Sequence, residues 1–124
     1  MKGVRREVEP GLWVDDRRAV FVEEAGALVV ADLHFGYEVS QRAAGWLLPV
    51  WGREVAVERL EGLLEDWSPD RLVLLGDLVH GRAGWLSLVG WLRGVRVEVV
   101  LVRGNHDRGA PKEVRLVEEW RGGG

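Results

Sequence analysis

The opening third of the chain alternates short apolar runs with polar breaks. Three runs rich in valine and leucine cover residues 11–16, 18–24 and 26–32, and Asp-Asp-Arg-Arg and Glu-Ala-Gly separate them. Such runs between turn-forming residues predict three short strands with hairpin connections. Residues 37–49 follow and contain a glycine and a proline that would interrupt a long helix, so a loop is predicted there.

The middle of the chain has a helical period. In residues 53–67, apolar side chains recur at spacings of three and four, which predicts an amphipathic helix. The members of this face are Val57, Leu60, Leu64 and Trp67. Residues 71–77 then form a continuous aliphatic run bounded by turn residues, as expected for a strand that is covered on both faces.

A second helix and strand follow in the same order. Residues 84–94 predict a short helix and residues 95–104 another strand, whereas residues 110–120 fit either a helix or a strand. The order strand, helix, strand, helix, strand over residues 27–104 implies parallel pairing through right-handed crossovers. The predicted fold class is therefore α/β, with a mixed sheet built around a parallel βαβαβ core.

Composition limits what such a chain can be. At 124 residues and 13.9 kDa, residues 1–124 are long enough for a single domain with a real core. No stretch of about 18 apolar residues occurs, so we expect no signal peptide, no membrane span and a cytoplasmic location. The net charge of -3 disfavours coating of nucleic acid through bulk charge. The chain has no cysteine, so any metal must be bound by His, Asp, Glu or Asn.

Side chains that can carry chemistry fall where the predicted parallel strands end, which is where such sheets bind ligands. They are Asp32 and His34 at the first end, Asp77 and His80 at the second, and Asn105, His106 and Asp107 at the third. In an extended segment residues two apart point the same way, so Asp32 and His34 can meet at one point. Gly76 is expected to allow a close approach of the backbone at the second end.

Each of these ends, taken singly, also has a plainer explanation. His34 and His80 could be packed polar residues, Asp77 could cap a helix, and residues 104–107 could form a satisfied turn. Taken together, however, all three histidines of the chain fall on one predicted sheet edge, which favours a metal site. Carboxylate, imidazole and amide donors suit manganese, iron or zinc, and Asp77 could bridge two ions about 3.5–4 Å apart.

The order D-x-H, G-D-x-x-H, G-N-H-D resembles that of the calcineurin-like metallophosphoesterase family over residues 27–107. The segment ADLHFGYE, followed by a glycine and by LLP at residues 47–49, is similar to the branch related to the Mre11 and SbcD nucleases and the ligase-associated phosphoesterases. The resemblance implies the N-terminal half of a metallophosphoesterase-type α/β sandwich. It also implies a metal-dependent phosphoesterase of phosphodiesterase or nuclease type that uses water activated by metal.

The resemblance further implies a role for each motif residue and two divalent ions, with manganese favoured over iron or zinc. Asp32 and His34 would hold the first ion, Asn105 would bind the second, and Asp77 would bridge the two ions. His106, oriented by Asp107, would stabilise the transition state or protonate the leaving oxygen. His80 would position the phosphodiester. The flanking arginines Arg82, Arg103 and Arg108 could clamp phosphate oxygens or could simply be solvated surface.

The chain departs from the family pattern after Asp107. The family also uses a later histidine and a terminal G-H-x-H, but residues 108–124 contain no histidine. Two hypotheses of different classes follow. The first is a phosphoesterase, acting on a phosphate ester or nucleic acid, whose missing ligands come from another segment or partner chain. The second is a catalytically incomplete scaffold or binding module with at most one weak metal site. Either would leave apolar surface that an oligomer or partner covers.

Overall fold

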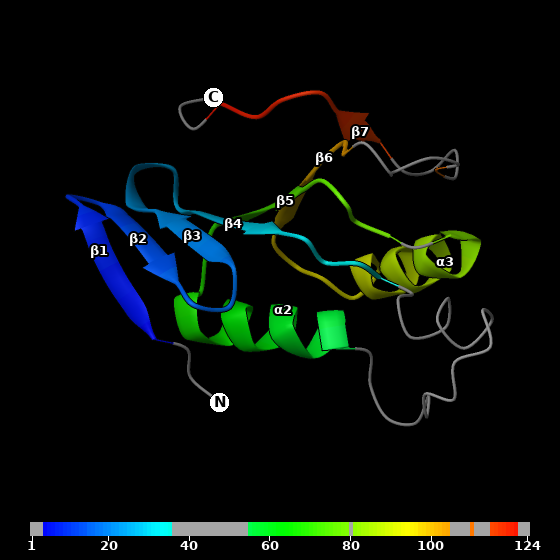
Figure 1. Cartoon of the computed structure of the whole chain (residues 1–124), viewed down its shortest axis with the longest axis horizontal. Helices are drawn as coiled ribbons and strands as arrows, with labels where there is room; N and C mark the ends of the chain where they lie inside the picture. The colour runs from blue at the N-terminus through cyan, green and yellow to red at the C-terminus, as the bar shows by residue number, and fades with distance from the viewer. Residues whose placement is uncertain (1–3, 36–54, 80, 105–109, 111–114, 122–124) are drawn as a thin grey trace.

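The computed structural model of the chain describes residues 4–35, 55–79, 81–104, 110 and 115–121. Within these residues the chain forms a seven-stranded sheet whose strands lie side by side in sequence order (Figure 1). The strands are β1 (Arg5–Glu9), β2 (Leu12–Asp15), β3 (Ala19–Val22), β4 (Ala27–Ala31), β5 (Arg71–Leu75), β6 (Glu98–Val102) and β7 (Leu116–Val117). The helices are the short 3-10 helix η1 (Glu23–Ala25), α2 (Val55–Trp67) and α3 (Gly81–Leu92).

The sheet is mixed. Strands β1 to β4 pair antiparallel, which for β2 to β4 is what the hairpin pattern predicted, and β4 to β7 pair parallel. Ala31 lies opposite Leu75, and Leu75 lies opposite Val102, so β4, β5 and β6 end at the same edge of the sheet. Helix α2 comes between β4 and β5 in the chain, and α3 comes between β5 and β6. The predicted α/β class with a parallel βαβαβ core is therefore confirmed.

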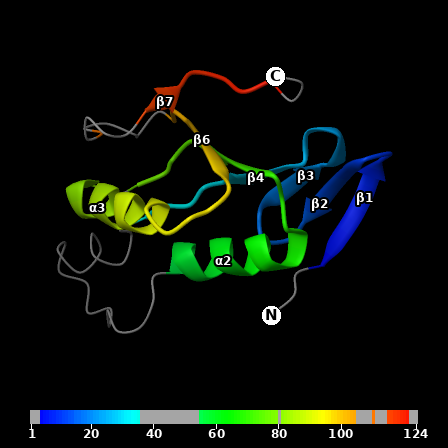
Figure 2. The same ribbon diagram turned by 180° about the vertical axis from the view of Figure 1, so that it is seen from behind.

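Both long helices cover the same face of the sheet (Figures 1 and 2). The main core forms between them and this face. Leu28 and Leu74 point into it from the strands, Leu60 from α2 and Trp85 from α3, and each of these side chains is at most 2% exposed. The alternation of side chains along a strand explains why Leu72 and Leu74 face the helices while Val73 between them does not.

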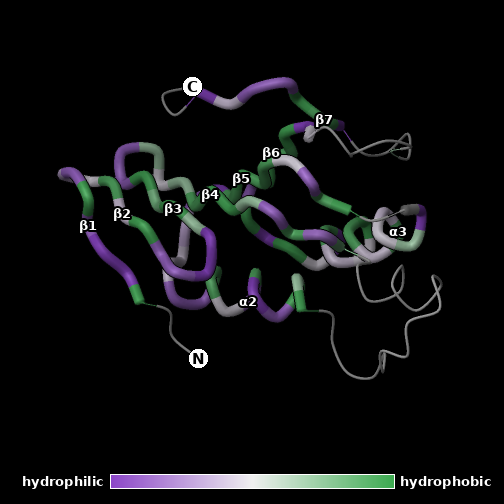
Figure 3. The backbone as a smooth tube through the Cα atoms, in the orientation of Figure 1, coloured by the Kyte–Doolittle hydropathy of each residue, from purple (hydrophilic) through white to green (hydrophobic). Residues whose placement is uncertain are grey.

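The opposite face of the sheet is also apolar. Ala27, Val73 and Val102 are buried there, and further aliphatic residues of β4 to β6 pack around them together with Trp120 of the C-terminal segment. Figure 3 shows hydrophobic positions concentrated along the central strands and hydrophilic positions along β1. The continuous aliphatic run at residues 71–77 is thus explained by burial on both faces, as the sequence predicted.

Strand β1 was not anticipated from the sequence. Its residues Arg5–Glu9 are all exposed, because it is the outer strand of the sheet and pairs only with β2 among the described residues. Charged side chains on an edge strand oppose pairing with another chain. An edge strand of this kind carries no apolar run, so hydrophobic patterning gives no signal for it.

The helices differ from prediction in detail. In α2 the buried positions are Ala56, Leu60 and Leu63, so the inward face is rotated from the predicted one, whose other members are only partly buried. Helix α3 begins at Gly81 rather than at residue 84. Within residues 110–120 the described part contains strand β7, which pairs parallel with β6, while the predicted loop at 37–49 lies outside the described residues. No helix in the described ranges is long and apolar enough to cross a membrane.

A buried ion-pair network ties the antiparallel strands to α2. The Asp15 carboxylate accepts hydrogen bonds from Nε and Nη2 of Arg17, at 2.9 and 2.7 Å, and from Nε1 of Trp67 at 3.0 Å. Arg17 also pairs with Asp66 of α2, at 2.8 Å. Burial by itself would raise the pKa of Asp15, but the hydrogen bonds from Arg17 and Trp67 outweigh it and lower the pKa to about 2.

This network predicts an acid-sensitive contribution to stability. Because the folded-state pKa of Asp15 lies below the ordinary value of 3.8, the stabilisation is present above about pH 4 and is lost as the pH falls towards 2. We expect Asp15→Asn to lower the free energy of unfolding by about 2 kcal/mol at neutral pH and to flatten its fall between pH 4 and 2. Urea unfolding across this pH range measures both effects. The neighbouring exposed Asp16, changed to Asn, is the control, and equal pH profiles for the two variants would contradict the prediction.

Candidate metal centre at the carboxyl ends of the parallel strands

The segments that follow β4 and β5 leave the sheet at the same edge and bring three predicted ligands together. One ligand atom from each of Asp32, His34 and Asp77 lies within 4.8 Å of the others. Asp32 is exposed, and His34 and Asp77 are partly buried. This cluster, called the carboxyl-edge cluster below, opens to solvent on the Asp32 side.

The backbone at the carboxyl-edge cluster is not extended, so the expectation that Asp32 and His34 meet because they lie two apart in an extended segment is wrong. Both residues are left-handed, with φ of 54° and 51°, and Asp77 is left-handed too, with φ of 45°. Non-glycine residues in this region cost of order 1–3 kcal/mol each and concentrate at functional sites. The side chains converge because the chain turns sharply at both strand ends.

Hydrogen bonds across the two turns hold this arrangement. The N–H of His34 donates to the carbonyl of Asp77 at 3.0 Å, and the N–H of Phe35 donates to the carbonyl of Leu78 at 2.8 Å. Phe35 and Val79 then form an isolated parallel bridge. The β4–β5 pairing thus resumes beyond the turns and fixes the His34 segment against the Asp77 segment.

Buried apolar side chains alternate with the ligands and anchor both turns. Leu33 and Phe35 flank His34 and are 5% and 0% exposed, and Leu78 follows Asp77 with no exposure. Helix α3 approaches closely here, because a Cβ at Gly84 would collide with the carbonyl oxygen of Phe35. Because Leu33, Phe35 and Leu78 pack into the core, the ligand side chains between and beside them lie at the sheet edge.

The third predicted segment arrives beside Asp77. Gly76 is left-handed, and its N–H donates to the carbonyl of Val102 at the end of β6. A Cβ built on Gly104 would collide with the backbone N of Asp77 and would lie 2.5 Å from the Cα of Gly76. The predicted close approach at Gly76 is confirmed, and Gly104 immediately precedes the predicted ligand Asn105.

Several predicted site residues lie outside the described residues, and their roles stay predictions. They are His80, Asn105, His106, Asp107 and Arg108. The alternative of Asp77 as the cap of the following helix is wrong, since α3 begins four residues later, at Gly81. Arg82, in the first turn of α3, and Arg103, just after β6, are both exposed. Arg103 lies 3.9 Å from the Glu118 carboxylate, a surface pair worth little energy, so its assignment as a phosphate ligand stays a prediction.

Arg59 was not identified from the sequence, yet it reaches the carboxyl-edge cluster from α2. Its Nη2 donates to the carbonyl of Ala31 at 2.7 Å and lies 3.4 Å from the carbonyl of Asp32. Burial lowers the pKa of its guanidinium, nearby Arg18 acts in the same direction, and Asp32 opposes both. A signal was present in the helical spacing, because Arg59 lies three residues after Ala56 and four residues before Leu63, beside the buried stripe of the helix.

The carboxyl-edge cluster fits a divalent cation. Donors that share one ion at about 2.1 Å lie roughly 3–4 Å apart, so binding would draw these side chains together by about 1 Å or more from spacings of up to 4.8 Å. Two carboxylates and an imidazole, with no thiolate, suit manganese, iron or zinc. The expected juxtaposition of Asp32, His34 and Asp77 is therefore present.

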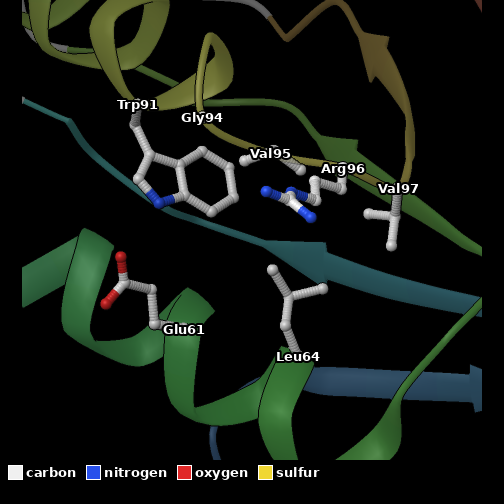
Figure 4. Close-up of a pocket in the computed structure, with 7 residues that line it drawn as sticks. All are labelled: Glu61, Leu64, Trp91, Gly94, Val95, Arg96 and Val97. Atoms are coloured by element: carbon white, nitrogen blue, oxygen red, sulfur yellow. The ribbon is translucent and has the colours of Figure 1, made fainter.

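A second hollow lies away from this cluster, between α2, α3 and the segment that leads into β6 (Figure 4). It has a volume of about 230 Å³, and Trp91 borders it from α3 while Glu61 and Leu64 border it from α2. Val97 lines it just before β6 begins, whereas Gly104 reaches Asp77 after β6 ends. The hollow is therefore at the opposite end of the parallel strands and does not belong to the carboxyl-edge cluster.

Fold and site together define an α/β protein with a candidate divalent-cation centre beyond the carboxyl ends of its parallel strands. A family model described as calcineurin-like phosphoesterase matches residues 27–123, and the chain belongs to this family. The chain is also similar to the crystal structure of a Pseudomonas putida nuclease, MPE, with 29% sequence identity and a TM-score of 0.62. That match covers 90% of this chain but 55% of the nuclease, so the chain spans just over half its length. A comparison with curated proteins gave no significant match.

Proposed function

We propose that this chain forms the metal-binding part of a phosphodiesterase or nuclease that hydrolyses phosphate esters. The carboxyl-edge cluster carries the proposal, because one ligand atom from each of Asp32, His34 and Asp77 lies within 4.8 Å of the others. Membership of the calcineurin-like phosphoesterase family and the similarity to a nuclease support it. Phosphate esters, including nucleic acid, are the proposed substrate class.

The residues divide into those that hold metal and those that handle the substrate. Asp32 and His34 would hold one ion, Asp77 would be shared, and Asn105 would bind a second. A bound divalent cation supplies Lewis-acid polarisation of the phosphate and a more acidic attacking water. His106, oriented by Asp107, would give a proton to the departing oxygen. The contact of Gly104 with Asp77 supports this assignment, since it brings the chain to the cluster one residue before Asn105.

We further propose that manganese is the resident metal and that additional ligands come from a segment or partner chain lying over the second face of the sheet. This face contains the buried Ala27, Val73 and Val102, and around them Val29, Leu75 and Val100 are only partly buried. The similar nuclease is nearly twice as long as the matched region, which leaves room for such a contribution.

The test is Mn²⁺ titration paired with hydrolysis of a generic phosphodiester such as bis-p-nitrophenyl phosphate. We expect Mn²⁺-dependent hydrolysis that falls by about 10²–10⁴-fold in His106→Ala, with Mn²⁺ binding retained, because this residue acts on the leaving group. Exposed Arg93, changed to Ala, is the control and should leave hydrolysis unchanged. Weak binding of a single ion without turnover, both by the chain alone and together with the segment or partner chain that covers the second face, would instead identify a metal-binding scaffold and overturn the enzymatic proposal.

A further inference from the structure

Arg59 occupies a position where a charged side chain is costly. It projects from α2 beside the buried Ala56, Leu60 and Leu63, and among the described residues its buried Nε has no hydrogen-bond partner. Burial lowers the pKa of the guanidinium, and the positive charge of Arg18 adds to this unfavourable environment. An apolar side chain of similar length, such as methionine, would fill this space without the cost of burying a charge.

Within the described ranges, the hydrogen bonds of the Arg59 side chain go to one turn of the chain. Strand β4 ends at Ala31, and the carbonyl of Ala31 accepts a hydrogen bond of 2.7 Å from Nη2 of Arg59. The same nitrogen lies 3.4 Å from the carbonyl of Asp32, the residue that turns into the left-handed region. Arg59 thus binds the backbone on the β4 side of the turn, while the N–H of His34 is tied to Asp77 on the other side.

We propose that Arg59 is a positioning residue for the carboxyl-edge cluster. Its hydrogen bonds to the backbone carbonyls hold the strained Asp32 turn, so that the carboxylate of Asp32 and the imidazole of His34 are aligned before a cation binds. Groups that orient metal ligands through such contacts typically change metal affinity by 10–100-fold when they are removed. The inference rests on the proposed function, because it assigns Arg59 to the same cation centre.

The sign of the effect separates positioning from simple electrostatics. Arg59 is itself positive, so loss of its charge alone would tighten the binding of a cation. A positioning role predicts the reverse, since an unsupported turn loses the alignment of its ligands. Arg18 offers a matched control, because it is exposed, contributes positive charge near Arg59, and makes no side-chain hydrogen bond to the turn within the described part of the chain.

The experiment compares Arg59→Met, Arg59→Lys and Arg18→Met by Mn²⁺ titration, with thermal unfolding and the amide chemical shifts of Leu33 and His34 recorded without metal. We expect Arg59→Met to weaken Mn²⁺ binding by about 10–100-fold and to move both amide signals. Arg59→Lys should restore part of the affinity, since an ammonium group can still donate to the Ala31 carbonyl. Arg18→Met should leave Mn²⁺ affinity unchanged or slightly higher.

Two results would overturn the inference. One is a folded Arg59→Met protein whose Mn²⁺ affinity is unchanged or higher, with amide shifts like those of the original chain. The other, should Arg59→Met not fold, is an Arg59→Lys protein with the same affinity and shifts as the original. Failure of the proposed function is distinct, because the unsubstituted chain would then show no Mn²⁺-dependent hydrolysis, while Mn²⁺ affinity and the amide shifts would still report whether Arg59 supports the turn.

Discussion

Asp77→Ala is expected to weaken Mn²⁺ binding on the order of 100-fold or more, the largest loss for any described residue. Asp77 supplies one of three donor groups in the carboxyl-edge cluster, and its carbonyl also accepts the hydrogen bond from His34. Removing its carboxylate takes away both a ligand and the negative charge that offsets the cation. Calorimetric titration or electron paramagnetic resonance of free Mn²⁺ measures the change.

Asp77→Gly separates the loss of Mn²⁺ binding from any loss of stability, because the fold should survive this second substitution. Asp77 is left-handed with φ of 45°, and glycine tolerates that conformation better than aspartate does. Asp77→Gly is therefore expected to abolish tight Mn²⁺ binding while leaving the free energy of unfolding equal or about 1 kcal/mol higher. Exposed Glu65 of α2, changed to Ala, is the control for loss of an acidic charge. Mn²⁺ affinity that is unchanged in both Asp77 variants would refute the metal centre.

Gly104→Ala is expected to have one of the largest effects on stability among the glycine substitutions. Its Cβ would collide with the backbone N of Asp77 and come within 2.8 Å of the carbonyl carbon of Gly76, and backbone atoms cannot rotate away as a side chain does. We expect a loss of about 3 kcal/mol in the free energy of unfolding. Mn²⁺ binding should weaken as well, because separation of the two segments displaces Asp77.

Gly90→Ala provides the matched control for this substitution. Gly90 lies in α3, is exposed, and a Cβ there would meet no atom within 4 Å, so alanine should stabilise the helix by up to about 1 kcal/mol. Urea unfolding of both variants measures the difference. A Gly104→Ala protein as stable as the original, with normal Mn²⁺ affinity, would show that the approach between the ends of β5 and β6 is not required.

Much of the site could be predicted because its signals are local. The aliphatic runs before Asp32, Asp77 and Asn105 end abruptly at polar residues, and alternating strands and helices can pair their strands in parallel only through crossovers. Parallel strands joined in this way end at one edge. The meeting of Asp32, His34 and Asp77 follows from that topology, without knowledge of any backbone angle.

The local geometry of the site could not be predicted in the same way. The left-handed conformations of Asp32, His34 and Asp77 are unfavourable for each residue alone, and they persist because hydrogen bonds between two distant segments and the buried Leu33 and Phe35 hold them. Arg59 is a further example. An arginine in a helix normally indicates a solvent-exposed position. The hydrogen bond of Arg59 to the end of β4 depends instead on how α2 packs across the sheet.

The sequence by itself therefore determined the α/β class, the order of strands and helices from β2 to β6, and the meeting of Asp32, His34 and Asp77, because periodicity and strand-end residues are properties of short segments. Only the tertiary structure decided the charged edge strand β1, the rotated face of α2, the sharp turns at Asp32 and Asp77, and the place of Arg59 behind them. Each of these depends on contacts between residues far apart in the chain, where packing outweighs local preference.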